Sequence, residues 1–278
     1  MITLNGKTVE IGSFPDGTIL MKSGDDHRGF ASIKWQYEND REFLGLIYLV
    51  KHLRRLGYRQ IDLTMPYIPN ARMDRVKSDE DVFTLKYFAE LLNSLNLSSV
   101  TVLDPHSSVS EALIDNLIIK KPDGYIEGVL NRIGVEELYC IPTNFLEPPK
   151  KKYNLTMFYP DEGSMKRYSG MVNLPYAFGI KKRNWETGKI EGLDVSGDVE
   201  SITGRNILIV DDICSRGGTF YHSAKKLKEL GANNIYLYVS HCENTILEGD
   251  LLKGDLIKKV YTTDSIFTKS HEKIEVLK

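Results

Sequence analysis

The residues best suited to chemistry lie between Ile207 and Thr219, where a short apolar run is followed by two carboxylates and two glycines. The apolar run predicts a buried strand, and ligands of open α/β sheets bind beyond the carboxyl ends of such strands. The glycines let backbone N–H groups close around a phosphate, and a helix predicted over Thr219–Leu230 adds donors at its N-terminus. A plain strand end followed by a capped helix would need only one acidic residue.

The two carboxylates, Asp211 and Asp212, do not suit a phosphate, because like charges repel. They suit either the hydroxyl groups of a neutral ribose, as hydrogen-bond acceptors, or a divalent cation. Carboxylates that bind a diol, next to a loop that binds a phosphate, describe a site for a ribose 5-phosphate group. The residues predicted to bind it are Asp211, Asp212, Ser215, Arg216, Gly217, Gly218 and Thr219.

The elements that must position these residues alternate between strands and helices. Apolar residues at spacings of three and four predict a helix from Asn39 to Gly57. The alternation predicts an α/β protein of two domains, each a mainly parallel sheet flanked by helices. The boundary is expected between Lys120 and Gly128, giving domains 1–124 and 125–278, with the active site in the cleft between them. The other predicted elements are a hairpin-like start (Thr3–Met21), strands (Ile61–Pro66, Ser99–Leu103, Ile207–Val210 and Ile235–Val239) and a helix (Val82–Leu95).

The composition excludes several classes of protein. The 278 residues include 36 Lys and Arg against 38 Asp and Glu, a formal charge of −2, which argues against sequence-independent nucleic-acid binding. The longest apolar run, Leu44–Val50, is far shorter than a membrane-spanning helix, and residues 1–12 lack a secretory pattern. Three scattered cysteines, Cys140, Cys214 and Cys242, do not form a disulfide or zinc pattern, so we expect a cytoplasmic protein.

Residues 207–219 resemble the 5-phosphoribosyl 1-pyrophosphate loop shared by type I phosphoribosyltransferases and ribose-phosphate pyrophosphokinases. Met65–Arg75 resembles the ATP-binding segment of the second family, which simple phosphoribosyltransferases lack. Six segments occur in that family's order and cover most of the chain. The chain therefore resembles the ribose-phosphate pyrophosphokinase (PRPP synthetase) family, as a divergent and shortened member with two phosphoribosyltransferase-like domains.

The resemblance implies a reaction and a set of substrate contacts. The anomeric hydroxyl of a ribose 5-phosphate group would attack the β-phosphorus of ATP, giving 5-phosphoribosyl 1-pyrophosphate and AMP. The residues implied to bind ATP are Phe14, Asp16, Arg72, Asp74, Arg75 and His106, and those implied to bind Mg²⁺ are His106 and Asp161. Without the resemblance, His106 would be read as a strand-end histidine and Asp161 as a turn aspartate. In relatives, Phe14 and Asp16 serve a neighbouring subunit, which predicts a homo-oligomer, either a dimer or a hexamer.

Catalysis is expected to depend on positive charge and positioning, because diphosphoryl transfer needs little covalent help. Arg72 and Arg75 can form forked contacts with the triphosphate. Lys182 and Arg183, in a segment that resembles the family's basic loop, are implied to offset charge on the transferring group. Taken alone, this basic triplet is more often a solvated loop, and the register that favours Lys182 over Lys181 stays open.

Several substrate-contacting positions depart from the family. Thr18 replaces an acidic residue, Met73 a glutamine, Ser215-Arg216 an Asp-Thr pair, and Asn184-Trp185 follows the basic loop where a second arginine is expected. Three alternatives stay open. The chain could carry out the same chemistry on a larger acceptor such as ADP-ribose, which belongs to NAD⁺ metabolism. It could also be a phosphoribosyltransferase or a non-catalytic regulatory relative. In a larger acceptor the ribose phosphate is bridged to a second phosphate, which Arg216 could meet.

Overall fold

A computed structural model describes residues 1–24, 29–135, 137–140, 150–183 and 190–278, and the side chains of residues 136–152 and 181–191 lie outside this description. The chain divides into two compact units, Met1–Lys121 and Pro122–Lys278. The expected boundary at 124/125 falls inside the first turn of helix α4 (Asp123–Ile133), which lies wholly in the second unit. Of the helices in the described residues, none is both long and apolar enough to cross a membrane.

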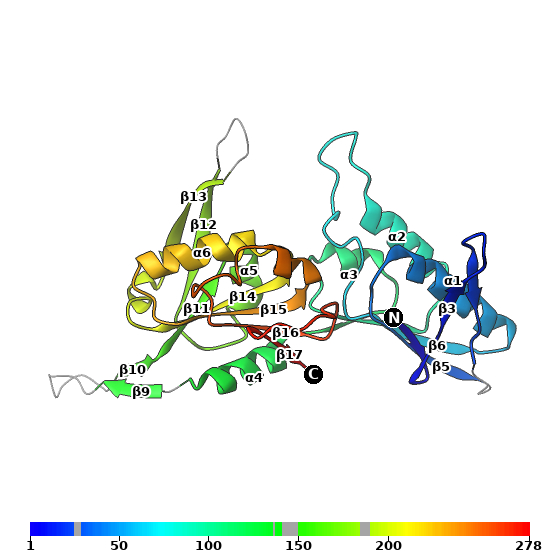
Figure 1. Cartoon of the computed structure of the whole chain (residues 1–278), viewed down its shortest axis with the longest axis horizontal. Helices are drawn as coiled ribbons and strands as arrows, with labels where there is room; N and C mark the ends of the chain where they lie inside the picture. The colour runs from blue at the N-terminus through cyan, green and yellow to red at the C-terminus, as the bar shows by residue number, and fades with distance from the viewer. Residues whose placement is uncertain (25–28, 136, 141–149, 184–189) are drawn as a thin grey trace. The chain divides into compact units, whose positions relative to one another are not determined.

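The first unit is built on a mainly parallel sheet with the strand order β2-β1-β5-β6-β7-β8. Strands β5 to β8 are parallel, and β1 pairs with β5 in the antiparallel sense. Strands β5, β6, β7 and β8 follow one another across the sheet in chain order, so every crossover moves the chain in the same direction. Right-handed crossovers then place the three helices on one face of the sheet, as Figure 1 shows. The strands are β1 (Ile2–Leu4), β2 (Lys7–Thr8), β5 (Phe30–Trp35), β6 (Gln60–Thr64), β7 (Ser99–Leu103) and β8 (Leu117–Lys120), and the helices are α1 (Asp40–Arg55), α2 (Thr84–Asn93) and α3 (Val109–Leu113).

A separate hairpin, β3 (Ile11–Ser13) and β4 (Ile19–Met21), packs on α1. A Cβ on Gly45 of α1 would lie 2.7 Å from the Cδ1 atom of Ile11, so the absence of a side chain allows this close approach. Arg41 of α1 donates to the carbonyl of Gly12 at 2.6 Å and to the Ser13 hydroxyl. The turn between β3 and β4 is therefore held on α1 by packing and by hydrogen bonds.

The second unit contains a sheet with the order β13-β12-β11-β14-β15-β16-β17, parallel except for the β12–β13 pair. Alternate residues of β14 (Asn206–Cys214) pack on opposite faces: Ile207 and Ile209 on α6 (Gly218–Glu229), and Leu208 and Val210 on α4. Burial on both faces explains the continuous apolar run. The remaining elements are β9 (Glu137–Cys140), β10 (Lys150–Tyr153), β11 (Leu155–Tyr159), β12 (Tyr176–Arg183), β13 (Ile190–Gly197), β15 (Ile235–Cys242), β16 (Lys259–Thr263), β17 (Ile274–Leu277), α5 (Glu162–Tyr168) and the 3₁₀ turns η1 (Val199–Ser201) and η2 (Asn244–Glu248).

The α/β architecture with two mainly parallel sheets is as predicted, and the predicted helices match α1, α2 and α6 closely. The strand expected over Ile207–Val210 is longer than predicted. It continues to Cys214, because its pairing with β15 extends to Asp211, Ile213 and Cys214. The two aspartates therefore lie in the last part of the strand itself, which fixes their backbone.

Candidate active site

The predicted phosphate loop connects β14 to α6 in the second unit. Gly217 has a φ of 79°, a left-handed conformation that starts the helix and that glycine adopts without strain. Among the described residues no side chain caps α6, so its first N–H groups have no side-chain acceptor. Gly218 is exposed, and a Cβ placed there would meet no described atom within 4 Å. The loop thus presents backbone donors at an open helix N-terminus, as anion binding requires.

Asp211 and Asp212 lie next to this loop with different surroundings. Partial burial raises the pKa of Asp211 well above its usual value, and the nearby charges of Asp212 and Asp161 raise it further. One Asp211 oxygen accepts the backbone N–H of Asp212 at 3.0 Å. Asp212 is buried, and its Oδ2 lies 3.5 Å from Nη1 of Arg167. The pair therefore offers one carboxyl that resists ionisation and one that is paired with a guanidinium.

Asp161 follows β11, the strand that pairs with β14, at the same edge of the sheet. It is the N-cap of α5, where its Oδ1 accepts the backbone N–H of Ser164 at 3.1 Å in a capping box. Sequence reasoning missed Arg167, which lies on this helix and reaches Asp212. A basic residue in a short helix carries no signal of such a contact, because the partner is far away in the sequence.

In the first unit, Asp74 connects the loops that follow β6 and β7. It is buried and accepts two hydrogen bonds from Arg75, at 2.8 and 3.1 Å. These bonds, together with the Ser107 side chain and the nearby His106, lower the pKa of Asp74. A backbone hydrogen bond of 3.0 Å from Leu103 to the Pro66 carbonyl also joins the start of both loops. Asp74, Arg75 and His106 are therefore brought together at the carboxyl edge of this sheet.

Other predicted residues are exposed at the surface or lie outside the described side chains. Arg72 is exposed in the loop after β6. Phe14 is 48% exposed in the turn of the β3–β4 hairpin, where Asp16 accepts hydrogen bonds from the backbone and hydroxyl of Thr18 at 3.0 and 2.7 Å. These bonds lower the pKa of Asp16. Lys182 and Arg183 end strand β12, and the positions of their side chains lie outside the described residues.

The fit of Mg²⁺ depends on the donors available. Within the described part of the chain, no group of three or more His, Cys, Asp or Glu side chains could hold a metal ion. Mg²⁺ does not require such a cluster, because proteins usually bind it through one or two carboxylates together with substrate phosphates and water. Asp161 has the oxygen ligands that Mg²⁺ prefers, whereas the imidazole of His106 is a less usual ligand.

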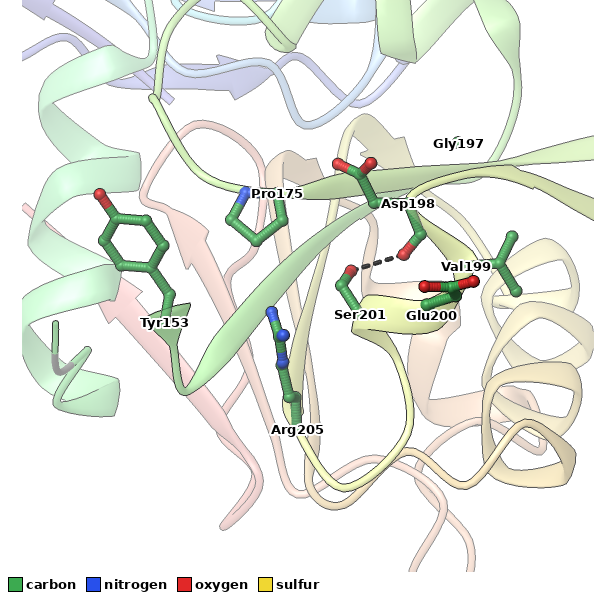
Figure 2. A pocket seen from close by; sticks show the side chains of 8 residues that line it. All are labelled: Tyr153, Pro175, Gly197, Asp198, Val199, Glu200, Ser201 and Arg205. Carbon is green, nitrogen blue, oxygen red and sulfur yellow. Dashed lines mark hydrogen bonds between the residues drawn. The ribbon is translucent and has the colours of Figure 1, made fainter. Parts of the chain in front are cut away.

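A cavity of about 730 Å³ lies elsewhere in the second unit. Its lining includes Tyr153, which precedes β11, and Arg205, which precedes β14, so it lies at the amino edge of the sheet (Figure 2). Ligands of such sheets bind at the opposite, carboxyl edge. The cavity contains none of the residues of the phosphate loop, which lies at the carboxyl edge of this sheet.

One of the two α/β units carries a glycine loop between paired carboxylates and a helix N-terminus, which is the arrangement predicted for a ribose 5-phosphate site. No family model matches the sequence. The chain is 27% identical over 280 residues to a ribose-phosphate pyrophosphokinase of Caldanaerobacter subterraneus, with 97% of this chain and 81% of the relative covered. It is 28% identical over 265 residues to a ribose-phosphate pyrophosphokinase of Bradyrhizobium diazoefficiens, with 91% and 76% covered.

Among solved structures, the phosphoribosylpyrophosphate synthetase of Mycobacterium smegmatis matches with a TM-score of 0.76 at 18% identity. The match covers 97% of this chain and 85% of that chain, and it shows that the fold is shared. The chain is thus related to the ribose-phosphate pyrophosphokinases over nearly all of its length. This confirms the resemblance predicted from the separate motifs.

Proposed function

We propose that the chain transfers the diphosphoryl group of ATP to the anomeric hydroxyl of a ribose 5-phosphate group, releasing AMP. The observation that carries this proposal is the uncapped N-terminus of α6 beside Asp211 and Asp212. The backbone donors of the loop suit the 5-phosphate, and the two carboxylates suit the ribose hydroxyls. The likeness to ribose-phosphate pyrophosphokinases supports the same reaction. The product is 5-phosphoribosyl 1-pyrophosphate.

The residues of the first unit have the properties that a triphosphate site needs. Arg72 is exposed, and Arg75 keeps a planar guanidinium at the surface while its Nε donates to Asp74. Guanidinium groups bind phosphate oxygens in a forked geometry, so both arginines are suited to orient ATP. Bound Mg²⁺, with Asp161 and His106 as proposed ligands, would neutralise charge on the phosphates. Asp74 keeps Arg75 and the His106 loop in place.

Positioning and charge supply the acceleration in this proposal. The phosphate loop fixes the acceptor at one end, which aims its anomeric oxygen, and no strong base is needed. Lys182 and Arg183, at the end of β12, are proposed to stabilise negative charge on the transferring group. The exposed Phe14 and Asp16 are proposed to contact the adenine bound by a neighbouring subunit, so that the active form is a homo-oligomer.

A second candidate acceptor is ADP-ribose, which ends in the same ribose 5-phosphate group but has its phosphate bridged to a second one. The rim of the phosphate loop favours it at one point. Arg216 is exposed there, with its guanidinium 3.1 Å from Glu248, which is also exposed. A surface pair of this kind contributes little to stability, so Arg216 can exchange Glu248 for a second phosphate at small cost.

The test is to incubate the purified protein with ATP, Mg²⁺ and each acceptor, and to follow AMP by chromatography. AMP that depends on ribose 5-phosphate supports the first candidate, and AMP that depends on ADP-ribose supports the second. Formation of ADP would show single phosphoryl transfer and contradict both. Release of pyrophosphate from 5-phosphoribosyl 1-pyrophosphate and a base would show a phosphoribosyltransferase. No turnover with any substrate, despite nucleotide binding, would indicate a regulatory relative.

The basic loop is tested separately by replacing its lysines one at a time. Lys182→Ala should lower turnover about 10²–10³-fold with little change in acceptor affinity, because it removes a donor that acts on the transferring group. Lys181→Ala is the matched control from the neighbouring position. If Lys181→Ala abolished turnover and Lys182→Ala did not, the register would be shifted by one residue.

A further inference from the structure

The phosphate loop packs against one segment, residues 243–251, which follows strand β15 and contains η2. Ser215, Arg216 and Gly217 of the loop each contact this segment. The Ser215 hydroxyl donates to Glu243 at 2.8 Å, and the Arg216 guanidinium pairs with Glu248. Gly217 packs so closely on Leu251 that a Cβ there would lie 2.8 Å from the Leu251 side chain. The geometry of the loop is therefore set by a second segment, distant in sequence, that the motif itself does not include.

Glu243 has the most specific of these contacts. Its Oε2 accepts hydrogen bonds from the hydroxyls of Ser215, at 2.8 Å, and Thr245, at 3.0 Å. Its backbone N–H donates to the carbonyl of Cys214, at 2.8 Å, at the end of β14. The main chain and the side chain of Glu243 thus hold consecutive residues of the β14 strand and loop. This places a carboxylate directly behind the phosphate loop.

The contact has two chemical consequences for a bound phosphate. A serine hydroxyl has one hydrogen, and Ser215 donates it to Glu243, so the recognition of phosphate is left to backbone N–H groups and Thr219. The Glu243 carboxylate also adds negative charge behind the loop, which raises the energy of an anion in proportion to its charge. A terminal phosphate monoester is close to doubly charged above pH 7, because its second pKa is about 6. A phosphodiester carries a single charge.

We propose that Glu243 is a positioning residue that shifts the charge preference of the phosphate loop towards a singly charged ribose phosphate and away from a doubly charged one. The proposal rests on the function proposed above, and it assigns the preference to a residue outside the loop motif. Glu243 acts through Ser215 and through its charge, and it needs no contact with the substrate. Its removal should alter the relative affinity for two ligands whose phosphates carry different charges.

The experiment measures equilibrium binding by calorimetry, without turnover, of two probes: ribose 5-phosphate and its methyl phosphodiester. Glu243→Gln keeps the acceptor oxygen for Ser215 and Thr245 and removes only the charge. We expect it to bind ribose 5-phosphate about tenfold more tightly relative to the methyl ester than the unmodified protein does. Glu243→Asp keeps the charge and should retain the original preference. Glu229→Gln, at the far end of α6, makes the same change in net charge and should alter neither affinity.

The possible results separate the two proposals. If Glu243→Gln weakens both probes equally, or changes neither, the residue has only a structural role and the inference is wrong while the proposed function stands. If the unmodified protein binds neither probe, the proposed function fails, and the charge preference fails with it. A relative gain for ribose 5-phosphate in Glu243→Gln alone supports the inference.

Discussion

The contact between Gly249 and the phosphate loop gives the sharpest test of the site. Gly249 has an ordinary backbone conformation, with φ of −86°, so any residue could adopt its dihedral angles. A Cβ at this position would nevertheless lie 1.9 Å from the carbonyl oxygen of Arg216 and 2.9 Å from its carbonyl carbon. Carbon and oxygen atoms that are not bonded stay roughly 3.3 Å apart, so Gly249→Ala must displace one backbone by more than about 1 Å.

The overlap is between a Cβ atom and a backbone carbonyl oxygen. The position of neither atom depends on a side-chain rotamer, so no change of rotamer relieves the overlap. A displacement of about 1 Å in a positioning element commonly costs on the order of 10²-fold in rate, and overpacking costs about 1–3 kcal/mol of stability. We therefore expect Gly249→Ala to lower kcat/KM for the acceptor about 100-fold and to leave the KM for ATP unchanged. Urea denaturation should show a loss of stability of about 1–3 kcal/mol.

The assay is AMP formation at varied acceptor and at varied ATP, on the same preparation used for denaturation. Gly170→Ala is the matched control in the second unit. Gly170 is exposed, has no left-handed φ, and would place its Cβ within 4 Å of no described atom. If Gly249→Ala had the acceptor kinetics and stability of Gly170→Ala, the close approach between the segment and the loop would be refuted.

Three further predictions concern ionisable groups. Burial and neighbouring carboxylates raise the pKa of Asp211, so its negative charge opposes folding at neutral pH. Asp211→Asn should therefore have a higher urea midpoint than the unmodified protein at pH 8. This difference in urea midpoint should vanish towards pH 4, as Asp211 becomes protonated in the unfolded state as well as in the folded state. The pKa of Asp74 is lowered, chiefly by its bonds to Arg75, so its stabilisation is present above about pH 4 and is lost on acidification. The difference in stability between the unmodified protein and Asp74→Asn should accordingly shrink below pH 4. Hydrogen bonding to Cys242 and burial raise the pKa of Cys214, and both thiols are fully buried. Neither thiol should therefore react with iodoacetamide at pH 8 until urea is added, which mass spectrometry can check.

Much of the fold could be predicted because local patterns agree with tertiary packing. Apolar residues of α1 recur at helical spacing, and among them Leu46, Val50 and Leu53 are buried in the first core. The extension of β14 to Cys214 could not be predicted, since it depends on pairing with β15 rather than on apolar character. Strand β17 was also not predicted, because it has only four residues and joins the sheet at its edge.

The candidate site divides in the same way. Asp211, Asp212 and the glycines of the loop could be found because their types and spacing carry the chemistry within one continuous segment. Arg167 and Glu243 could not be found, because each acts through a partner that is distant in the sequence and becomes a neighbour only when strands align. The predicted roles of Lys182 and Arg183 stay predictions.

The close approach of Gly217 to Leu251, and of Gly249 to the Arg216 carbonyl, has a consequence for transplanting this loop between proteins. Because the phosphate loop and residues 243–251 are in close contact, a change in one segment requires a matching change in the other. A chimera that receives only residues 211–219 in a foreign scaffold would meet whatever side chains lie beneath, and would lose the conformation that presents its amides. Grafting should succeed only when residues 243–251 are transferred together with the loop. The two segments are separate in the sequence but form one structural unit.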